Sequence, residues 1–326
     1  MILEDYIFTG CYSNDIQGLI QQKKQSGYIY DSAKYILIQF DQFCIKNDIN
    51  EPTITKEISD AWKSYHADES KSRRASRMGV LRQLAQYMMD QGKECYIPSK
   101  FSAQGYRMPY VMNDNEIREF FAVADHYVPQ IKGLRFQILA EEYKVLFRLI
   151  YCCGLRVSEA RKLRIKNINF EKRTALILCS KGDKDRLIYI ADDVCEIYLQ
   201  MIQILHEKYN FYSEYLFPSS NPYKPLEVAS INKKFKEFWK NTSGASDSRY
   251  PTVHSLRYSF VVKRMNLWME EGKNLTAMMP YLSKYLGHES VENTYYYYYQ
   301  IESAFKIVRQ KDLLSDRVIP EVAYEE

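Results

Sequence analysis

The chain has 326 residues, about twice the ~150 residues typical of one domain, so its length predicts two domains. Its composition, 46% hydrophobic and 26% charged, excludes a disordered or collagen-like chain, and no apolar segment reaches the ~20 residues that a membrane span needs. The net charge of +4 is too small to indicate a nucleic-acid partner by itself, whereas 29 tyrosines, five of them consecutive at 295–299, are unusual.

The N-terminus and the cysteines both favour a cytoplasmic location. Glu4 and Asp5 stand where a secretory signal carries basic residues. The seven cysteines follow no regular spacing and form neither a C-x-x-C pair nor a Cys/His cluster. We therefore expect reduced, mostly buried thiols. Separately, we expect no cofactor and no bound metal.

Residues 1–95 are predicted to form a helical N-terminal domain. From about 14 to 91 apolar residues recur at helical spacing, as at Phe40 and Phe43. The last helix of this stretch carries a run of basic residues, namely Lys71, Arg73, Arg74, Arg77 and Arg82. Such a run is usually a solvated face, and alone it indicates no more than that.

The helical period lapses over 96–111, where two prolines and a glycine interrupt the pattern, so this segment is predicted to be a linker. Asn113 and Glu116 then have the spacing of a capping box, which predicts the start of a helix. A second domain is therefore expected over 112–326.

Helical patterns dominate this second domain, except where three short β-branched or aliphatic runs predict strands at 164–170, 174–179 and 186–190. The second and third runs are joined by S-K-G-D-K-D at 180–185, whose glycine and aspartates are typical of a hairpin connection. The expected fold is therefore mainly α with a small antiparallel sheet, of the α+β class.

The segment G-L-R-V-S-E at 154–159 is the first of four places where cations and hydrogen-bond donors concentrate. Ser158 is predicted to cap the following helix, which would place Arg156 just before a helix N-terminus that favours an anion. The guanidinium fork of arginine suits phosphate. A surface ion pair between Arg156 and Glu159 is the ordinary alternative, and taken alone it is favoured.

The other three places lie further along the chain. In H-S-L-R at 254–257, His254 and Arg257 are predicted to lie one helical turn apart on the same face. Lys181 belongs to the hairpin connection, where a solvated turn lysine is the ordinary explanation. L-G-H at 286–288 precedes Thr294 and the five tyrosines.

Other catalytic classes leave no signature in the sequence. It contains no P-loop motif, no H-E-x-x-H metal motif and no G-x-S-x-G nucleophile motif. The remaining inventory of two arginines, two histidines, a lysine and a tyrosine suits an anionic, phosphate-like transition state without a metal.

The four places, in this order, resemble the motifs of the tyrosine recombinase (phage integrase) family. G-L-R-V-S-E is similar to the first arginine motif, S-K-G-D-K-D-R at 180–186 to the hairpin lysine motif, H-S-L-R to H-x-x-R, and L-G-H to the motif before the nucleophile. Ser180 departs from the glycine usual before the motif lysine, and Lys184 is a second lysine in the same segment. The resemblance covers about residues 110–310, and the first domain is similar to the family's core-binding domain only in position and helical character.

The resemblance implies a role for each of these residues. Arg156 and Arg257 would bind the non-bridging oxygens of the scissile phosphate, and Lys181 would protonate the leaving 5′ oxygen. His254 would act as acid/base partner, His288 would hydrogen-bond the phosphate, and Glu159 would hold the cations in place. The family is identified with site-specific DNA recombination, through a covalent 3′-phosphotyrosyl intermediate and a Holliday junction, without metal or ATP.

The register of the tyrosine run decides the nucleophile that the resemblance implies. In the family the tyrosine follows the L-G-H histidine by nine positions, with a threonine three before it, and this count selects Tyr297. Neighbouring tyrosines on a helix differ in direction by about 100°, so Tyr296 and Tyr298 are the alternatives.

The family further implies double-stranded DNA as the partner and gives a role to the basic residues of the first domain. Lys71, Arg73, Arg74, Arg77 and Arg82 would contact phosphates or grooves. The amphipathic segment 301–314 would dock on a neighbouring protomer, giving a tetramer on two DNA sites, assisted in some systems by accessory DNA-bending or directionality proteins. The alternative for this segment is a helix that packs on its own chain.

Two alternatives to a recombinase or integrase of a mobile genetic element remain at this point. The first is relaxation of DNA by a type IB topoisomerase, which uses the same chemistry. The second is a non-catalytic DNA-binding protein that retains the fold. The target sequence, and the choice among integration, excision, resolution, inversion and transposition, are not encoded in any motif here.

Overall fold

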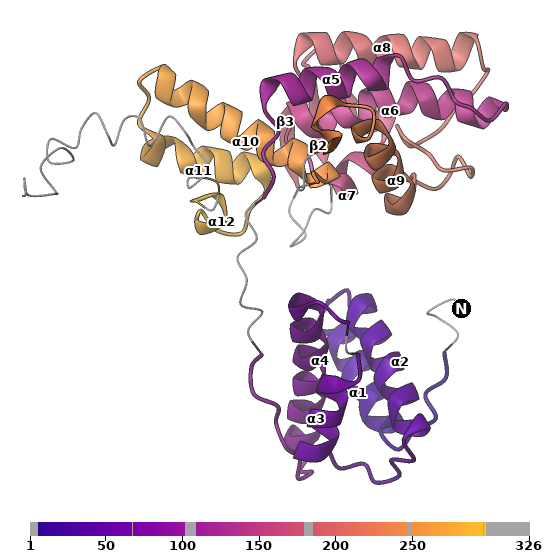
Figure 1. The fold of residues 1–326 in the computed structure, drawn as a ribbon, viewed down its shortest axis with the longest axis vertical. Coiled ribbons are helices and arrows are strands. Elements are labelled where there is room, and N and C mark those ends of the chain that lie inside the picture. The colour runs from indigo at the N-terminus through magenta and orange to yellow at the C-terminus, as the bar shows by residue number, and fades with distance from the viewer. Residues whose placement is uncertain are drawn as a thin grey trace, which may run out of the picture. The chain divides into compact units, whose positions relative to one another are not determined.

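The computed structural model describes residues 6–66, 68–101, 109–178, 185–246, 250–295 and 297. The chain divides into two compact units, Met1–Arg107 and Met108–Glu326, each with its own core (Figure 1). Among the described residues, no helix is long and apolar enough to span a membrane.

Four helices form the described part of the first unit: α1 (Ser13–Gln25), α2 (Asp31–Lys46), α3 (Lys56–Ser64) and α4 (Lys71–Asp90). Helix α4 packs against the other three. Phe40, Phe43 and Trp62 form an aromatic centre, with Phe40 and Trp62 meeting edge to face at 5.3 Å between ring centroids. The helical spacing of the apolar residues thus corresponds to a real buried face, as predicted.

The second unit is built around α6 (Leu134–Cys152), which packs against α5 (Asp114–Asp125), α8 (Asp192–Glu207) and α10 (Val253–Glu270). The capping box predicted at Asn113 and Glu116 is confirmed at the start of α5. The other helices described in this unit are α7 (Val157–Arg161), α9 (Val228–Trp239), α11 (Leu275–Leu286) and α12 (Glu292–Tyr295), with two 3-10 turns at Ile165–Asn167 and Ser243–Ser246.

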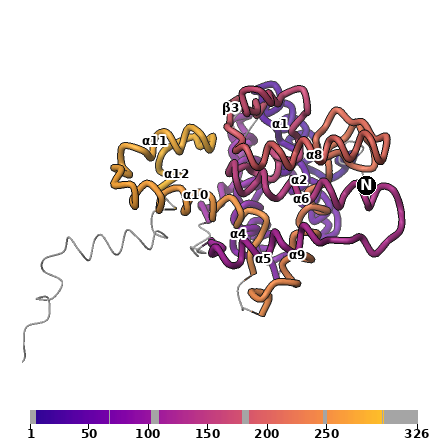
Figure 2. The backbone as a smooth tube through the Cα atoms, turned by 90° about the horizontal axis from the view of Figure 1, so that it is seen from above, coloured from indigo at the N-terminus to yellow at the C-terminus, as the bar shows by residue number. Residues whose placement is uncertain are grey.

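Helices α11 and α12 lie at one end of this unit, away from α5 and α8, and α10 runs from this end toward the larger core (Figures 1 and 2). Helices α10 and α11 share a smaller apolar cluster that includes Met265, Met279 and Tyr297. Helix α10 also packs against α6, so it connects the larger core with this end of the unit.

The sheet contains β1 (Ile168–Asn169), β2 (Thr174–Ile177) and β3 (Arg186–Tyr189), in that order and antiparallel throughout. Ala175 and Ile188 are paired and face the core, whereas Leu176 and Leu187 are paired and face outward. The mainly helical α+β class with a small antiparallel sheet is thereby confirmed.

The predicted strand at 164–170 is too long. Residues 165–167 form a 3-10 turn, and Arg164 makes an isolated bridge with Tyr215 instead of joining the sheet. Only two residues therefore remain for β1. The connection at 179–184, which includes Lys181, lies outside the described residues.

Candidate active site

The C-terminal end of α11 carries the carbonyl groups around which the site is built. Gly287 ends the helix in the left-handed conformation, with φ 65°. The carbonyls of Tyr285, Leu286 and Gly287 each accept hydrogen bonds from arginine side chains. Because the last carbonyls of a helix lack helical partners and carry partial negative charge, this end of α11 favours cations.

Arg156 occupies the N-cap position of α7, so the prediction that Ser158 stands at that position was wrong. The backbone N–H of Arg156 donates to Glu159 Oε2 at 2.9 Å, and its Nη1 donates to Glu159 Oε1 at 2.7 Å. Its guanidinium also donates to the carbonyl of Gly287 at 3.0 Å. The Arg156–Glu159 pair therefore exists, but the two side chains are only 19% and 3% exposed, so it is no surface ion pair.

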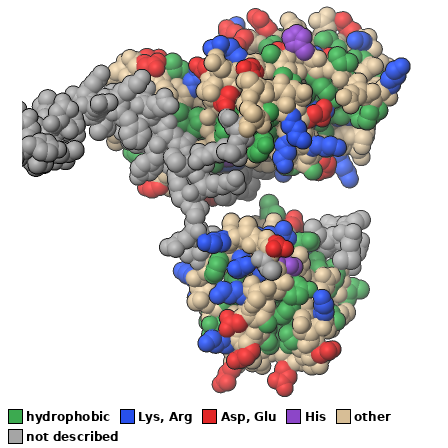
Figure 3. Space-filling model, in the orientation of Figure 1, with side chains coloured by type: hydrophobic (Ala, Val, Ile, Leu, Met, Phe, Trp, Pro, Cys, Tyr) green, Lys and Arg blue, Asp and Glu red, His purple; other side chains and the backbone are tan. Residues whose placement is uncertain are grey.

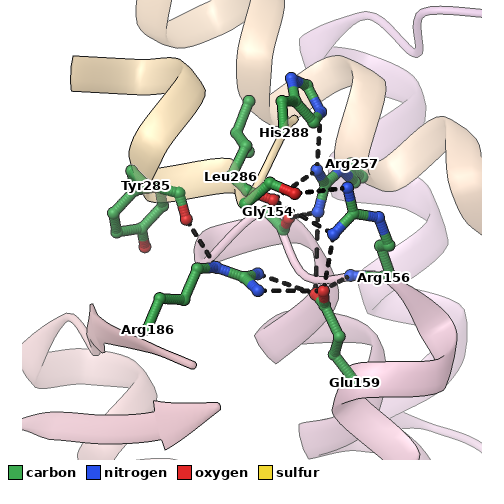
Figure 4. A network of polar contacts seen from close by, with 9 residues as sticks. Gly154, Arg156, Glu159, Arg186, Arg257, Tyr285, Leu286 and His288 are labelled. Atoms are coloured by element: carbon green, nitrogen blue, oxygen red, sulfur yellow. Dashed lines mark hydrogen bonds and ion pairs between the residues drawn. The ribbon is translucent and has the colours of Figure 1, made fainter. Parts of the chain in front are cut away.

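Glu159 lies at the centre of three guanidinium groups (Figure 4). Arg186 donates to both carboxylate oxygens, Nη1 to Oε1 at 3.0 Å and Nη2 to Oε2 at 2.8 Å. Arg257 approaches to 3.8 Å, which is too long for a hydrogen bond. Three cations surround one anion, so the cluster carries two net positive charges.

The pKa of Glu159 reflects this environment. Burial alone would raise it, but hydrogen bonds and charge from Arg186, together with Arg156, lower it to about 2. The carboxyl group is therefore ionised at neutral pH. A buried site with excess positive charge is an environment that binds an anion such as a phosphodiester.

Arg257 projects from α10 and is 1% exposed. Its Nη1 donates to the carbonyl of Gly154 at 2.7 Å, and its Nη2 donates to the carbonyl of Leu286 at 2.9 Å. Position 154 favours glycine because its φ is +61° and a Cβ there would lie 2.5 Å from the ring of Phe260. The guanidinium is thus fixed by backbone groups.

His288 has one tautomer compatible with its contacts. Arg257 Nη2, which can only donate, lies 3.0 Å from Nε2, so Nε2 accepts and the proton resides on Nδ1. Nδ1 then donates to Thr294 Oγ1 at 2.7 Å. Burial and the charge of Arg257 lower the pKa of His288 to about 3, so the ring is neutral.

His254 and Arg257 lie one turn apart on α10, as predicted. The His254 ring meets Tyr258 edge to face at 4.6 Å between centroids. Burial and the charge of Arg257 lower the pKa of His254 to about 4, so this imidazole is also neutral at pH 7 and able to accept a proton.

Tyr297 is 4% exposed and belongs to the apolar cluster of α10 and α11. Its ring lies parallel to that of His288, with centroids 6.2 Å apart, and 5.2 Å from the ring of Tyr258. Burial raises the pKa of the phenol, whereas the charge of Arg257 and a hydrogen bond with it act in the opposite direction. Tyr296 and Tyr298 lie outside the described residues.

A cavity of about 530 Å³ brings the predicted residues together. It is lined by Arg156, His254, Arg257, His288 and Tyr297. Glu159 contacts the arginines without lining the cavity, and Lys181 lies outside the described residues. Of the six predicted residues that the structure describes, five line this cavity, and the sixth, Glu159, holds the arginines.

Arg186 is a member of this cluster to which the sequence assigned no role. It is the last residue of S-K-G-D-K-D-R, so its position in the hairpin motif was a signal. Its partners were not predictable, because the carbonyl of Tyr285 lies 99 residues away in the chain. Thr294, noted only as a spacing marker, accepts the hydrogen bond from Nδ1 of His288.

The basic run of α4 divides into exposed and buried members. Lys71 is exposed, the Arg73 side chain is 65% exposed, and Arg74 and Arg82 are partly buried. Arg77 is 1% exposed, donates to Glu69 at 2.7 Å and to the carbonyls of Trp62 and Lys63, and lies over the Trp62 ring. Its prediction as a DNA contact was wrong, because its guanidinium is fully engaged inside the unit.

Basic side chains are unevenly distributed over the first unit. Several of them gather on one side of its visible face, whereas Asp and Glu gather at its lower end (Figure 3). A small net charge therefore coexists with a locally basic surface.

Comparison with known proteins places this geometry in a family. The model of the phage integrase family matches residues 111–304, which is more than half of the chain. The chain belongs to the phage integrase family. Its members are tyrosine recombinases, so the protein is an enzyme of DNA strand cleavage and religation.

Two relatives agree with this membership. The integrase/recombinase y4rB of Sinorhizobium fredii is 27% identical over 290 residues, covering 86% of this chain and 90% of that protein. Tyrosine recombinase XerD of Staphylococcus aureus is 28% identical over 193 residues, covering 59% of this chain and 58% of that protein.

Two solved structures share the fold at low identity. XerH site-specific recombinase, in a post-cleavage complex with palindromic difH substrate, matches with TM-score 0.63 and 18% identity over 91% of this chain and 83% of that one. The Tn1549 transposon integrase, in complex with a circular intermediate DNA, matches with TM-score 0.63 and 15% identity over 90% of this chain and 98% of that one.

Proposed function

We propose that this recombinase is site-specific and that it cuts and rejoins double-stranded DNA through a covalent 3′-phosphotyrosyl intermediate at Tyr297. The observation that carries the proposal is the common cavity of Arg156, His254, Arg257, His288 and Tyr297. A phosphodiester in this cavity would meet two guanidinium groups, two neutral imidazoles and a phenol. This set of groups matches the needs of phosphoryl transfer to a tyrosine.

The proposed cleavage step is a direct displacement at phosphorus. Tyr297 Oη forms a bond to the phosphorus as the bond to the 5′ oxygen breaks, and the phenolic proton passes to His254. Lys181 protonates the 5′ oxygen, and Arg156 and Arg257 stabilise the charge on the non-bridging oxygens. Because the phosphotyrosyl bond conserves the energy of the cleaved bond, the proposed reaction requires no ATP. It requires no metal because Arg156 and Arg257 stabilise the charge and Lys181 supplies the proton.

The first unit is proposed to hold the DNA through the exposed part of the basic run. Lys71 and Arg73 are available for phosphates, with Arg74 and Arg82 beside them. DNA as partner is also supported by the complexes of XerH with difH substrate and of the Tn1549 integrase with a circular intermediate DNA. In this scheme residues 1–95 bind DNA, 96–111 connect the units, and 112–326 perform the chemistry.

Strand exchange through a Holliday junction requires several active sites at once, so we propose a homotetramer on two DNA sites, in the cytoplasm. The amphipathic segment 301–314, which lies outside the described residues, is the proposed contact between protomers. Accessory DNA-bending or directionality proteins would act on this assembly.

A suicide substrate tests the proposed chemistry. Duplexes built from the DNA that flanks the gene, nicked just 3′ of each candidate scissile phosphate, lose the short 5′-hydroxyl fragment after cleavage and trap the covalent complex. We expect a detergent-stable protein–DNA adduct whose peptide map places the DNA on Tyr297. Tyr297→Phe should form no adduct.

Tyr295→Phe is the matched control, because Tyr295 is 37% exposed on α12 and outside the residues that line the cavity. It should form the adduct like the parent protein. An adduct on Tyr296 or Tyr298 would overturn the register but keep the chemistry. Relaxation of arbitrary plasmids would instead favour a type IB topoisomerase, and binding without any cleavage would favour a non-catalytic DNA-binding protein.

A further inference from the structure

Arg186 is the third guanidinium of the site, yet it is absent from the residues that line the cavity. We propose that Arg186 is a positioning residue that keeps Glu159 from drawing Arg257 into a direct hydrogen bond, so that Arg257 stays directed at the phosphate. This inference rests on the proposed function. In this role Arg186 acts through Glu159 and does not itself contact the DNA.

The two oxygens of Glu159 are both occupied. Oε1 accepts from Arg156 at 2.7 Å and from Arg186 at 3.0 Å, and Oε2 accepts from the backbone of Arg156 at 2.9 Å and from Arg186 at 2.8 Å. The Arg186 and Glu159 side chains are 8% and 3% exposed. Because Arg186 binds the two oxygens in parallel, it fixes the plane of the carboxylate as well as its position.

Arg257 is the nearest alternative partner for Glu159. Its Nη1 lies 3.8 Å from Oε2, which is about 0.9 Å longer than the ~2.9 Å of a normal N–H···O hydrogen bond. Without Arg186, one side of the carboxylate would lose its partners in a buried site, which is costly unless another cation replaces them. Rotation toward Arg257 would supply that cation.

Such a pairing would affect the cavity directly. Arg257 contacts His288, and its charge and hydrogen bond oppose the rise in the pKa of Tyr297 that burial causes, so a shift of its guanidinium would alter the surroundings of two residues of the proposed reaction. The cluster would also fall from two net positive charges to one. Both changes weaken the binding of the charged transition state.

Arg186 is itself held on two sides, which suits a positioning role. Its Nε donates to the carbonyl of Tyr285 at 2.7 Å, and its backbone pairs with Ile177 at the end of β2. A Cβ on Gly287 would lie 3.0 Å from Arg186 Nη1, so the glycine leaves room for the guanidinium. The side chain therefore connects β3, α7 and the end of α11.

The experiment compares single-turnover cleavage of the trapping substrate with cleavage of the same duplex carrying a methylphosphonate at the scissile position. The methyl group removes the negative charge that the arginines stabilise. Arg186→Met should cleave the ordinary phosphodiester on the order of 10- to 100-fold more slowly, less than the 10²–10³ typical of losing a direct donor. On the methylphosphonate its deficit should be much smaller.

A second variant makes the mechanism falsifiable without the modified DNA. In Arg186→Met combined with Glu159→Gln, no anion remains to pair with Arg257, so cleavage of the phosphodiester should recover part of the loss. Arg186→Lys keeps one charge but cannot bind both oxygens in parallel, and we expect an intermediate rate.

Arg135→Met is the matched control. Arg135 binds Glu142 in the same parallel manner, at 3.0 and 3.1 Å, and donates to the carbonyl of Pro218, but neither side chain lines the cavity. This variant should lose stability while its cleavage rates, measured below its melting temperature, stay at the parent level on both substrates.

Three outcomes would overturn the inference: parent-level cleavage by Arg186→Met, an equal deficit on both substrates, or a double variant slower than the single one. If the parent protein itself forms no adduct, the proposed function fails instead, so the two failures are distinguishable.

Discussion

His254 is an uncharged histidine inside a cationic site. Burial and the neighbouring guanidinium of Arg257 lower its pKa to about 4, against an ordinary value of 6.5. Burial and proximity to cations thus keep the ring unprotonated at pH 7, which is the state that the proposed attack by Tyr297 requires.

This lowered pKa has a consequence for stability in the absence of DNA. Between pH 6.5 and about 4 the unfolded chain protonates His254 and the folded chain does not, so the free energy of unfolding decreases as the pH falls through this window. The slope amounts to about 1.4 kcal/mol per pH unit for one histidine. His288, with a pKa lowered to about 3, contributes in the same direction.

His254→Gln should therefore remove its share of the slope and keep that of His288. Urea unfolding of both proteins at several values between pH 7 and pH 4.5 measures the effect. Equal slopes for parent and variant would show that His254 is protonated in the folded protein as readily as in the unfolded one.

Single residues were predictable where a motif is local. Arg156, His254, Arg257, His288 and Tyr297 were selected from short motifs, and they line one cavity. The contacts that orient them were not predictable, because they join distant parts of the chain: Arg257 donates to the carbonyl of Gly154, 103 residues away. Backbone carbonyls carry no sequence signature, so this part of the site required the structure.

At the scale of the element, the first two turns of α4 combine a structural and a surface role. Glu69, just before the helix, has a side chain that is 3% exposed and lies within 4.0 Å of Arg73, Arg74 and Arg77. Only Arg77 is buried with it. The carboxylate of Glu69 thus anchors the helix through Arg77 and also lies beside the exposed Arg73 and the partly buried Arg74.

Substitution of Arg77 and Arg73 should separate these roles. Arg77→Ala leaves Glu69 buried without its main partner, so the first unit should lose about 3–5 kcal/mol of unfolding free energy, measured by urea denaturation. Arg73→Ala should leave stability within about 0.5 kcal/mol of the parent. It should instead weaken DNA binding and lower the slope of log affinity against log salt by about 1.

If Arg77→Ala instead kept its stability and lowered the slope of log affinity against log salt, Arg77 would be a DNA contact after all. Its position in a basic run made that assignment natural from the sequence. The sequence does not show that one arginine of the run pairs with a buried carboxylate. All five basic residues were therefore predicted to contact DNA.

On the scale of the whole molecule, each unit has a core of its own. Trp62 is fully buried in the first core, whereas Trp239 and Trp268, the other two tryptophans, belong to clusters of the second unit. Two separate cores of this kind are expected to fold independently.

The fragment 1–107 should therefore fold alone, with Trp62 as its single fluorophore. We expect blue-shifted emission and one cooperative urea transition, and the fragment 108–326 should give its own transition. Red-shifted Trp62 emission without a cooperative transition would mean that the first core depends on the second unit.

Periodicity predicted the fold class, because long helices repeat their apolar positions many times. Boundaries of short elements were less predictable: the run from Arg164 contains enough β-branched residues for a strand, yet its first part turns as a 3-10 helix and Arg164 bridges to Tyr215. Tertiary contacts overrode local preference there. The same holds for α7, whose five residues are too few to show a period.

The end of α11 bears on how such an enzyme could be redirected to new DNA. All three arginines of the site are held by consecutive carbonyls of residues 285–287. A carbonyl is common to every amino acid, so libraries that vary side chains across the DNA-facing surface leave this support in place. Only changes that alter the path of the main chain at Gly287 would remove this support. Residues that can be varied to change DNA specificity are therefore distinct from those on which turnover depends.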